Sequence, residues 1–145
     1  MRTRFAVVSL ALAASLGGIA LAPTADAAHH QSAPLSVARL VKAPGFNAAG
    51  TWSIYQSNVL IATLNVTQDA QGNLTGTASK SGSSATGTID QGFVDGNYIY
   101  FVIPWSDGTK GRYIGSLGAD RHLSGASTDL AHPTSQATWN TTQTF

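Results

Sequence analysis

Hydrophobic and polar residues alternate along the chain from Gly50 to the C-terminus. Trp52 and Ile54 alternate with polar neighbours, and Leu64 and Val66 do the same in the next stretch. A period of two is typical of β-strands that have one buried and one exposed face. The pattern predicts eight strands, at residues 51–56, 59–68, 74–79, 86–94, 97–104, 110–117, 122–128 and 136–143.

Short turns separate the predicted strands. Asp95-Gly96 is a strong signal for a two-residue hairpin, and Asp107-Gly108 marks a further turn. Short connections pair consecutive strands antiparallel, and such a sheet keeps two exposed edges unless it closes. We therefore predict an all-β fold, an eight-stranded antiparallel up-and-down β-barrel. A two-sheet sandwich is the alternative, although it usually needs longer connections.

Glycines inside the predicted strands support a tightly curled sheet, because they allow a large side chain to lie across the backbone. These glycines are Gly76, Gly87, Gly92, Gly111, Gly115 and Gly125. The large side chains that they could receive are Trp52, Phe101, Trp105, Tyr113 and Trp139. The interior is then either filled by these aromatic rings or left with a cavity above the small residues.

The first residues have the pattern of a secretory signal peptide. Arg2 and Arg4 precede an apolar run at residues 5–21, and Ala25-Asp26-Ala27 matches a cleavage site. We expect residues 1–27 to be removed, which makes the mature protein secreted and extracellular, with no membrane partner after cleavage. A membrane anchor is disfavoured, because the apolar run is short and rich in alanine and glycine.

Residues 28–49 differ from the alternating part of the chain. Pro34 and Pro44 bound a stretch with little alternation that is too short for a stable isolated helix. We predict an N-terminal arm at residues 28–49, either flexible or containing a short helix. The β-barrel domain is expected at residues 50–145.

Composition narrows the range of functions. The chain has 145 residues, 10% of them charged, with no cysteine and a formal net charge of +1. The lack of cysteine excludes disulfides, thiolate metal sites and a cysteine nucleophile. The near-neutral charge provides no basic surface for nucleic acid. No pattern predicts a metal site or a cofactor, and the alanine-, glycine-, serine- and threonine-rich composition is typical of a secreted bacterial protein.

Four short motifs carry a resemblance to a known family. They are A-G-T-W at residues 49–52, D-A-Q-G-N-L-T-G-T at 69–77, I-P-W-S-D at 103–107 and G-R-Y-I-G at 111–115. In this order they resemble the avidin/streptavidin family of secreted, calycin-type β-barrels, over about residues 50–115. The resemblance implies a barrel with a ligand pocket at one mouth, often in a tetramer, and thus a homo-oligomer as one expected assembly.

Most of the family's biotin-contact positions are not matched. Trp105 corresponds to a pocket tryptophan at the end of its strand. Ile54, Ala78 and Lys80 stand where the family has a polar residue, a tyrosine and a serine. A buried polar ligand group that loses its partners binds weakly. The resemblance therefore implies the scaffold with a different binding chemistry.

Aromatic residues remain as the clearest candidates for ligand contacts, because tryptophan stacks on flat rings and sugars. We expect a non-catalytic binding protein that takes a small apolar or aromatic ligand, or a sugar, at the barrel mouth without a cofactor. The candidate ligand-binding residues are Trp52, Asn58, Ala78, Trp105, Tyr113 and Trp139.

Two other functions fit the sequence. An extracellular protein-binding or enzyme-inhibitor barrel with a filled core would act through turns such as residues 107–110. A barrel enzyme would use Asp129 and His132, because an aspartate that orients a histidine supplies a general base. The same pair also suits a turn. Tyr98 and Tyr100 alternate with apolar residues, so we expect them on the outer face, where they suit contact with another subunit or protein.

Overall fold

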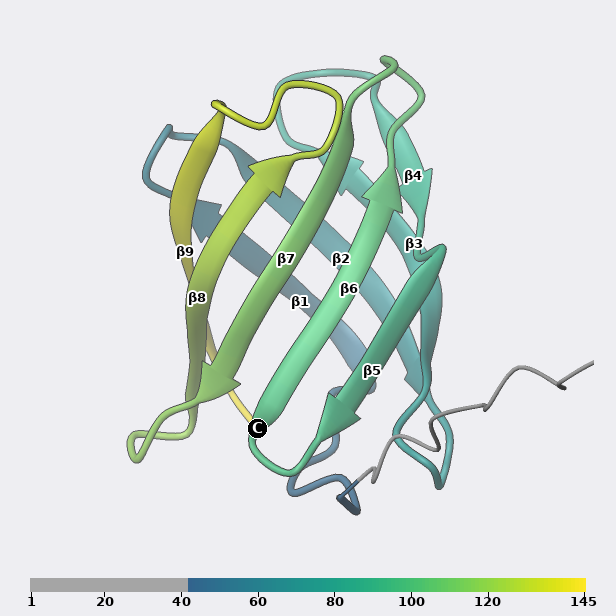
Figure 1. The fold of residues 1–145 in the computed structure, drawn as a ribbon, viewed down its shortest axis with the longest axis vertical. Helices are drawn as coiled ribbons and strands as arrows, with labels where there is room; N and C mark the ends of the chain where they lie inside the picture. The colour runs from purple at the N-terminus through teal and green to yellow at the C-terminus, as the bar shows by residue number, and fades with distance from the viewer. Residues whose placement is uncertain (1–41) are drawn as a thin grey trace, which may run out of the picture. The chain divides into compact units, whose positions relative to one another are not determined.

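The computed structural model describes residues 42–145, which form nine β-strands and no helix. The strands are β1 (Gly50–Gln56), β2 (Ile61–Gln68), β3 (Leu74–Lys80), β4 (Thr86–Thr88), β5 (Gln91–Asp95), β6 (Tyr98–Pro104), β7 (Lys110–Leu117), β8 (His122–Asp129) and β9 (Gln136–Thr144). They form one sheet in the order β4-β3-β2-β1-β9-β8-β7-β6-β5, with every pair antiparallel. Figure 1 shows that the sheet curls, so that β1–β3 lie behind β5–β8. The prediction of an all-β, barrel-like fold is confirmed.

The structure has nine strands where the pattern predicts eight, because the strand expected at residues 86–94 is interrupted between β4 and β5. The chain changes its hydrogen-bond partner at this point. The Ile89 amide donates to the Gly76 carbonyl of β3 at 2.9 Å, whereas the Asp90 amide donates to the Val102 carbonyl of β6 at 3.0 Å. A strand that turns from one neighbour to the other cannot keep a single regular ladder.

The first and last strands pair with each other, as a curled sheet requires. In this antiparallel pairing, Tyr55 lies opposite Asn140 and Gln56 lies opposite Trp139. At the two ends of the strand order, isolated bridges join Asn73 to Phe93 and Gly87 to Trp105.

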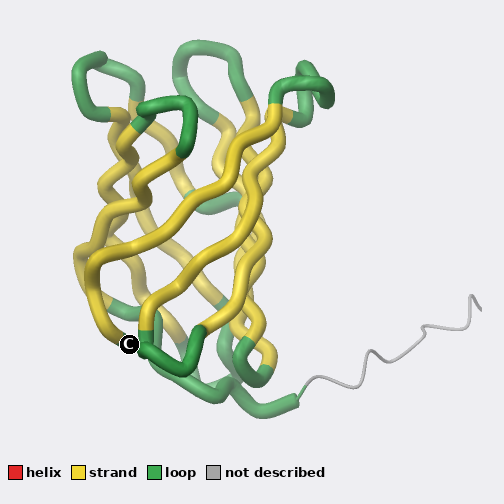
Figure 2. The backbone as a smooth tube through the Cα atoms, turned by 90° about the vertical axis from the view of Figure 1, so that its left-hand side faces the viewer, coloured by secondary structure: helices red, strands yellow, loops and turns green. Residues whose placement is uncertain are grey.

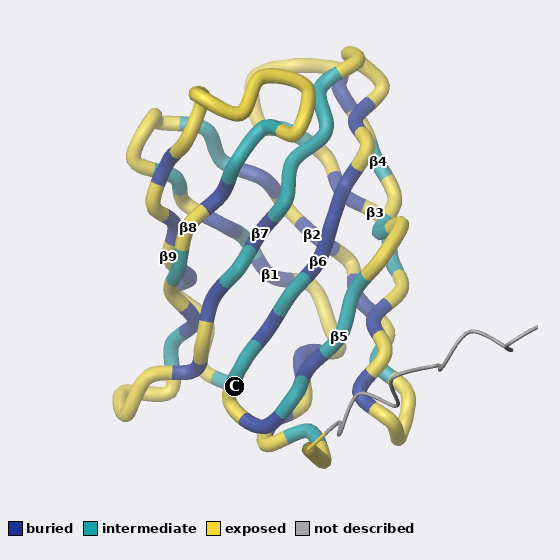
Figure 3. The backbone as a smooth tube through the Cα atoms, viewed as in Figure 1, coloured by how far each residue is buried: buried dark blue, intermediate teal, exposed yellow. Residues whose placement is uncertain are grey.

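Aromatic rings fill most of the interior. Trp52 and Phe101 are buried and meet edge to face, with ring centroids 6.1 Å apart. Phe101 stacks on Tyr113 at 4.8 Å and 11°. Figure 3 shows buried and exposed positions alternating along the strands, as the period of two predicts.

One end of the sheet is closed by the segment that precedes β1 and by the C-terminal residue; this is the closed end. Phe46 is buried and packs edge-on against Phe145 at 6.0 Å, and Phe145 packs against Trp52 at 5.4 Å. The Gln68 side chain accepts from the Ala48 amide at 2.7 Å and donates to the Phe46 carbonyl at 3.1 Å.

The predicted arm is described only from residue 42, and residues 42–49 are ordered without a helix. The predicted signal peptide, residues 1–27, and the arm up to residue 41 lie outside the described residues. Within residues 42–145 the structure has no helix of the length and apolar character that a membrane span needs.

Candidate ligand-binding site

A cavity of about 120 Å³ lies at the opposite end of the sheet, which we name the open end. Figure 2 shows the loops that gather at the two ends of the strands. The open-end loops follow β1, β3, β6 and β8. Inward-facing and loop side chains around the cavity include Gln56, Asn58, Lys80, Trp105, Tyr113, Ser127 and Asp129.

Two in-strand glycines position the aromatic walls of the cavity. A Cβ atom on Gly87 would lie 2.7 Å from the Pro104 carbonyl oxygen and 3.3 Å from Trp105 Cε3. A Cβ atom on Gly111 would lie 2.8 Å from Tyr113 Cε2 and 3.0 Å from the Tyr113 hydroxyl. Because glycine has no side chain, both rings lie close against the sheet, as the glycine pattern predicts.

Tyr113 is the buried polar group at the centre of the site. Burial raises the pKa of its hydroxyl to about 12, and the Asp129 carboxylate adds to the increase. The side chains of Trp105 and Gln56 hydrogen-bond to this hydroxyl and act in the opposite direction on its pKa. Tyr113 therefore keeps its proton throughout the physiological pH range.

Gln56 and Ser127 extend this network across the sheet. The Ser127 hydroxyl donates to Gln56 Oε1 at 2.6 Å and lies 3.3 Å from the Ala137 carbonyl oxygen. Gln56 comes from β1 and Ser127 from β8, so the bond joins strands that are not neighbours in the sheet order. Satisfied polar groups of this kind hold a site rigid.

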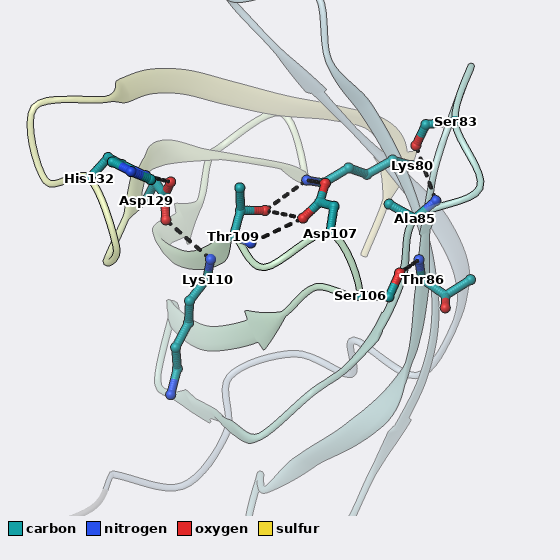
Figure 4. Close-up of polar contacts among 10 residues, drawn as sticks. All are labelled: Lys80, Ser83, Ala85, Thr86, Ser106, Asp107, Thr109, Lys110, Asp129 and His132. Carbon is teal, nitrogen blue, oxygen red and sulfur yellow. Dashed lines mark hydrogen bonds and ion pairs between the residues drawn. The ribbon is translucent and has the colours of Figure 1, made fainter.

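Lys80 lies between the cavity and the loop that follows β6, and Figure 4 shows its polar partners. Its ammonium group donates to Asp107 Oδ2 at 2.7 Å and to Thr109 Oγ1 at 2.9 Å. It also lies 4.8 Å from the centroid of the Trp105 ring. The hydrogen bond from Lys80, followed by those from Thr109, lowers the pKa of Asp107 to about 2. The ammonium charge is therefore already compensated.

Asp129 and His132 meet beside the cavity. His132 Nδ1 lies 2.9 Å from Asp129 Oδ2, while Asp129 Oδ1 accepts the amides of Lys110 at 3.1 Å and Ala131 at 3.0 Å. The hydrogen bond with His132 is the largest cause of the lowered pKa of Asp129. The His132 side chain is 73% exposed. These hydrogen bonds of Asp129 hold the loop after β8 in place.

The structure brings together three of the six predicted ligand-binding residues. Trp105, Tyr113 and Asn58 line the cavity. Trp52 instead belongs to the packed interior near the closed end. The other two residues also lie away from the cavity.

Trp139 packs across Gly115, with its indole N–H donating to the Ala126 carbonyl at 3.0 Å. Ala78 borders a larger but more open groove of about 630 Å³ near the outer positions of β2, β3 and β4. We favour the smaller cavity as the site because it is more enclosed and has convergent polar groups.

Gln56 and Ser127 were missed as site residues, although the sequence contains a signal for them. Gln56 is in phase with Trp52 and Ile54, and Ser127 is in phase with Leu123, so both are polar residues at inward positions. A buried polar group needs a partner, which makes such positions candidates for a site.

No group of three histidine, aspartate or glutamate side chains within residues 42–145 is placed to hold a metal ion. Comparison with protein-family models, with curated proteins and with solved structures finds no match to this chain. The resemblance to the avidin/streptavidin family therefore rests on the sequence motifs.

Proposed function

We propose that this protein is a secreted, non-catalytic binding protein whose ligand enters the open end of an eight-stranded, avidin-like up-and-down barrel. The eight-stranded description counts β4 and β5, which are separated by residues 89 and 90, as one bent strand. The bridges from Asn73 to Phe93 and from Gly87 to Trp105 support closure on both sides of this strand. Secretion rests on the signal pattern at residues 1–27.

The observation that carries the proposal is the contrast between the packed interior and the cavity beside Trp105 and Tyr113. Pockets for drug-sized ligands hold about 300–1,000 Å³, whereas this cavity holds about 120 Å³. The ligand is therefore small, or only its end group enters. Trp105 provides a flat wall for an aromatic ring or a sugar.

A fragment screen followed by amide NMR spectra of the mature protein tests this function. Bound fragments should move the signals of Gly111, Tyr113 and Ser127, which come from two strands beside the cavity. They should not move those of Phe46 or Val94 near the closed end. Fragments that move no signals, or that move closed-end signals only, would contradict the proposal. The variant Trp105→Ala should weaken the binding of every fragment that binds the wild type.

A protein-binding or inhibitor function is the second candidate, because the rim of the open end exposes apolar side chains. Val59 is 91% exposed and Leu130 is 39% exposed, and they belong to the loops after β1 and β8. A partner that binds the wild type and a Tyr55→Ser control, but not the Val59→Ser/Leu130→Ser variant, would favour this function.

A homo-oligomer is also proposed, through the aromatic residues on the outer face of β5 and β6. Phe93 stacks on Tyr100 at 5.1 Å and lies 6.1 Å from Tyr98, whereas Ile99 and Phe101 face inward. Size exclusion of the Tyr98→Ser/Tyr100→Ser variant tests this assembly. The proposal would be contradicted if the wild type were a monomer. It would also be contradicted if the wild type were an oligomer and the variant kept the same mass.

A further inference from the structure

The outer face of one half of the sheet carries no charged side chain. This half consists of β9, β1, β2, β3 and β4, which are neighbours in the sheet order. Its exposed positions hold mostly threonine, together with serine, asparagine, glutamine, one glycine and one tyrosine. Lys80 is the only charged residue of these five strands, and it lies at the cavity of the open end. We name this outer surface the neutral face.

The lack of charge is specific to this half of the sheet. The other strands carry the aspartate, lysine and arginine residues Asp95, Lys110, Arg112 and Asp129. A soluble protein surface usually has charges of both signs interspersed. A face without charged groups cannot compensate a charge on a bound partner, and an uncompensated charge is costly to remove from water. The neutral face therefore suits an uncharged partner.

A hollow of about 340 Å³ lies on the neutral face where β1 pairs with β9. Tyr55 lies directly opposite Asn140 in this pairing, and both line the hollow with Ser57 and Thr138. Side chains at opposite positions have Cβ atoms about 4.5–5.5 Å apart. Tyr55 is 38% exposed, the most exposed aromatic residue among residues 42–145. The hollow therefore combines an accessible ring with an adjacent amide.

The polar groups around the hollow are available to a ligand. Within residues 42–145, the side chains of Tyr55, Thr138 and Asn140 form no hydrogen bond. The Ser57 hydroxyl accepts the Thr138 amide at 3.1 Å and keeps its own proton to donate. Hydroxyl and amide side chains both donate and accept, as the hydroxyl groups of a sugar do. The two sets of groups are therefore complementary.

The neutral face continues beyond the hollow across the neighbouring strands. Ser53, Thr63, Ser79 and Thr86 form one row of hydroxyl groups across β1, β2, β3 and β4. The first two hydroxyls lie 3.1 Å apart. Since adjacent strands are about 4.8 Å apart, the row is roughly 15 Å long. It offers polar contacts over a greater length than a single sugar ring.

We propose that the hollow binds one ring of a neutral oligosaccharide and that the rest of the chain lies on the neutral face. The apolar C–H side of the sugar ring packs on Tyr55, while its hydroxyl groups bind Asn140, Ser57 and Thr138. The volume of the hollow is within the range of small-molecule sites, about 300–1,000 Å³. This site is on the outside of the sheet, so the inference goes beyond the proposed function of the open end.

Three oligosaccharides of the same length test the site. Cellohexaose and chitohexaose are neutral, and the β-1,4-linked hexamer of glucuronic acid has the cellohexaose backbone with a carboxylate on each ring. Each is titrated into the mature wild-type protein at neutral pH while the backbone and side-chain amide signals of Asn140 and the backbone amide signal of Tyr55 are followed by NMR. At least one neutral hexamer should move these signals, and it should bind about tenfold more tightly than the glucuronic acid hexamer.

Ring truncation identifies the contact. Tyr55→Ala should weaken binding of the neutral hexamer about tenfold, because the stacking surface is lost. Tyr55→Phe keeps the ring and should keep most of the affinity. Tyr98→Ala, on the outer face of β6, is the matched control and should bind like the wild type. If Tyr55→Ala does not fold, Asn140→Ala takes its place and should bind roughly threefold to tenfold more weakly.

The outcomes separate this inference from the proposed function. If no neutral hexamer moved the Tyr55 and Asn140 signals, if the glucuronic acid hexamer bound equally well, or if folded Tyr55→Ala kept the wild-type affinity, the inference would be overturned. Hexamers that moved only the signals of Gly111 and Tyr113 would overturn it and support the open end as the site. Signals of the neutral face that moved with protein concentration alone would show that a second copy of the chain binds there, which also overturns it.

Discussion

The two ends of the curled sheet are built on the same alternation and differ in what points inward. At the closed end, Phe46, Trp52 and Phe145 pack edge to face. At the open end, Gln56 and Lys80 take inward positions and leave a cavity. The inward residues therefore decide whether an end of the sheet is filled or can receive a ligand.

The change from apolar to polar inward residues occurs along single strands. β1 places Trp52, Ile54 and then Gln56 at successive inward positions. β8 likewise runs from Leu123 to Ser127. Apolar burial stabilises the closed end, whereas the polar groups of the open end need hydrogen-bond partners from neighbouring strands.

The largest expected difference between the two ends comes from truncating a tryptophan at each. Trp52→Ala should lower the free energy of unfolding by about 3–5 kcal/mol, as expected for a fully packed aromatic residue. Trp105→Ala should lower it by about half as much, because one side of that ring faces the cavity. Urea unfolding measures both, and equal losses would contradict the comparison.

Gly111→Ala should disturb the open end without affecting the closed one. The added Cβ would lie 2.8 Å from Tyr113 Cε2, so the ring must shift. We expect a loss of about 1–3 kcal/mol in urea unfolding, together with a changed Tyr113 amide signal. Ser116→Ala, at an exposed position of the same strand, is the control and should leave both unchanged.

Acid should weaken the open end through Asp107. Its pKa in the folded protein is about 2, below the usual 3.8, because Lys80 and Thr109 hydrogen-bond to the carboxylate. The stabilisation of the folded protein by the Asp107 carboxylate is present above about pH 4, and it is lost as the pH falls through 2. Since Asp107 is largely solvated, it amounts to less than about 1 kcal/mol.

The variant Asp107→Asn tests this contribution by urea unfolding at pH 6 and at pH 2.5. The difference in the free energy of unfolding between the wild type and the variant should be smaller at pH 2.5 than at pH 6. If Asp107→Asn changed the free energy of unfolding by the same amount at both pH values, the stabilising role of the Asp107 carboxylate would be refuted.

The smallest expected effect is a gain in stability at the rim. Val59 adopts a φ of 62°, which is unfavourable for a β-branched residue. Val59→Gly relieves this strain, although glycine makes the unfolded chain more flexible, so we expect a net gain of about 0.5 kcal/mol. A lowered melting temperature in calorimetry would show that the Val59 side chain stabilises the loop.

The sequence predicted the strands better than it predicted the site. The alternation placed Trp52, Phe101 and Trp105 on inward positions. The in-strand glycines indicated that large rings lie across the backbone, and the structure pairs Gly87 with Trp105 and Gly111 with Tyr113. Alternation reports which face a residue occupies and carries no information on its depth along the barrel axis. For that reason it did not distinguish Trp52, at the closed end, from Trp105.

The interruption between β4 and β5 was also invisible to the pattern, because it arises from a change of neighbour between β3 and β6. Such a change depends on how the whole sheet curls. The contact between Gln56 and Ser127 has the same origin, since it joins residues 71 positions apart.

The three tryptophans offer the most direct test of the open end as the binding site. Their indole N–H groups give separate NMR signals, and those of Trp52 and Trp139 donate to the carbonyls of Ala48 and Ala126. The Trp105 indole bonds to the Tyr113 hydroxyl. In a titration with a fragment that binds this protein, the Trp105 signal should move while the other two stay fixed, and the moving signal should be absent in Trp105→Phe. Movement of the Trp52 or Trp139 signal instead, or no movement of any of the three, would contradict the account.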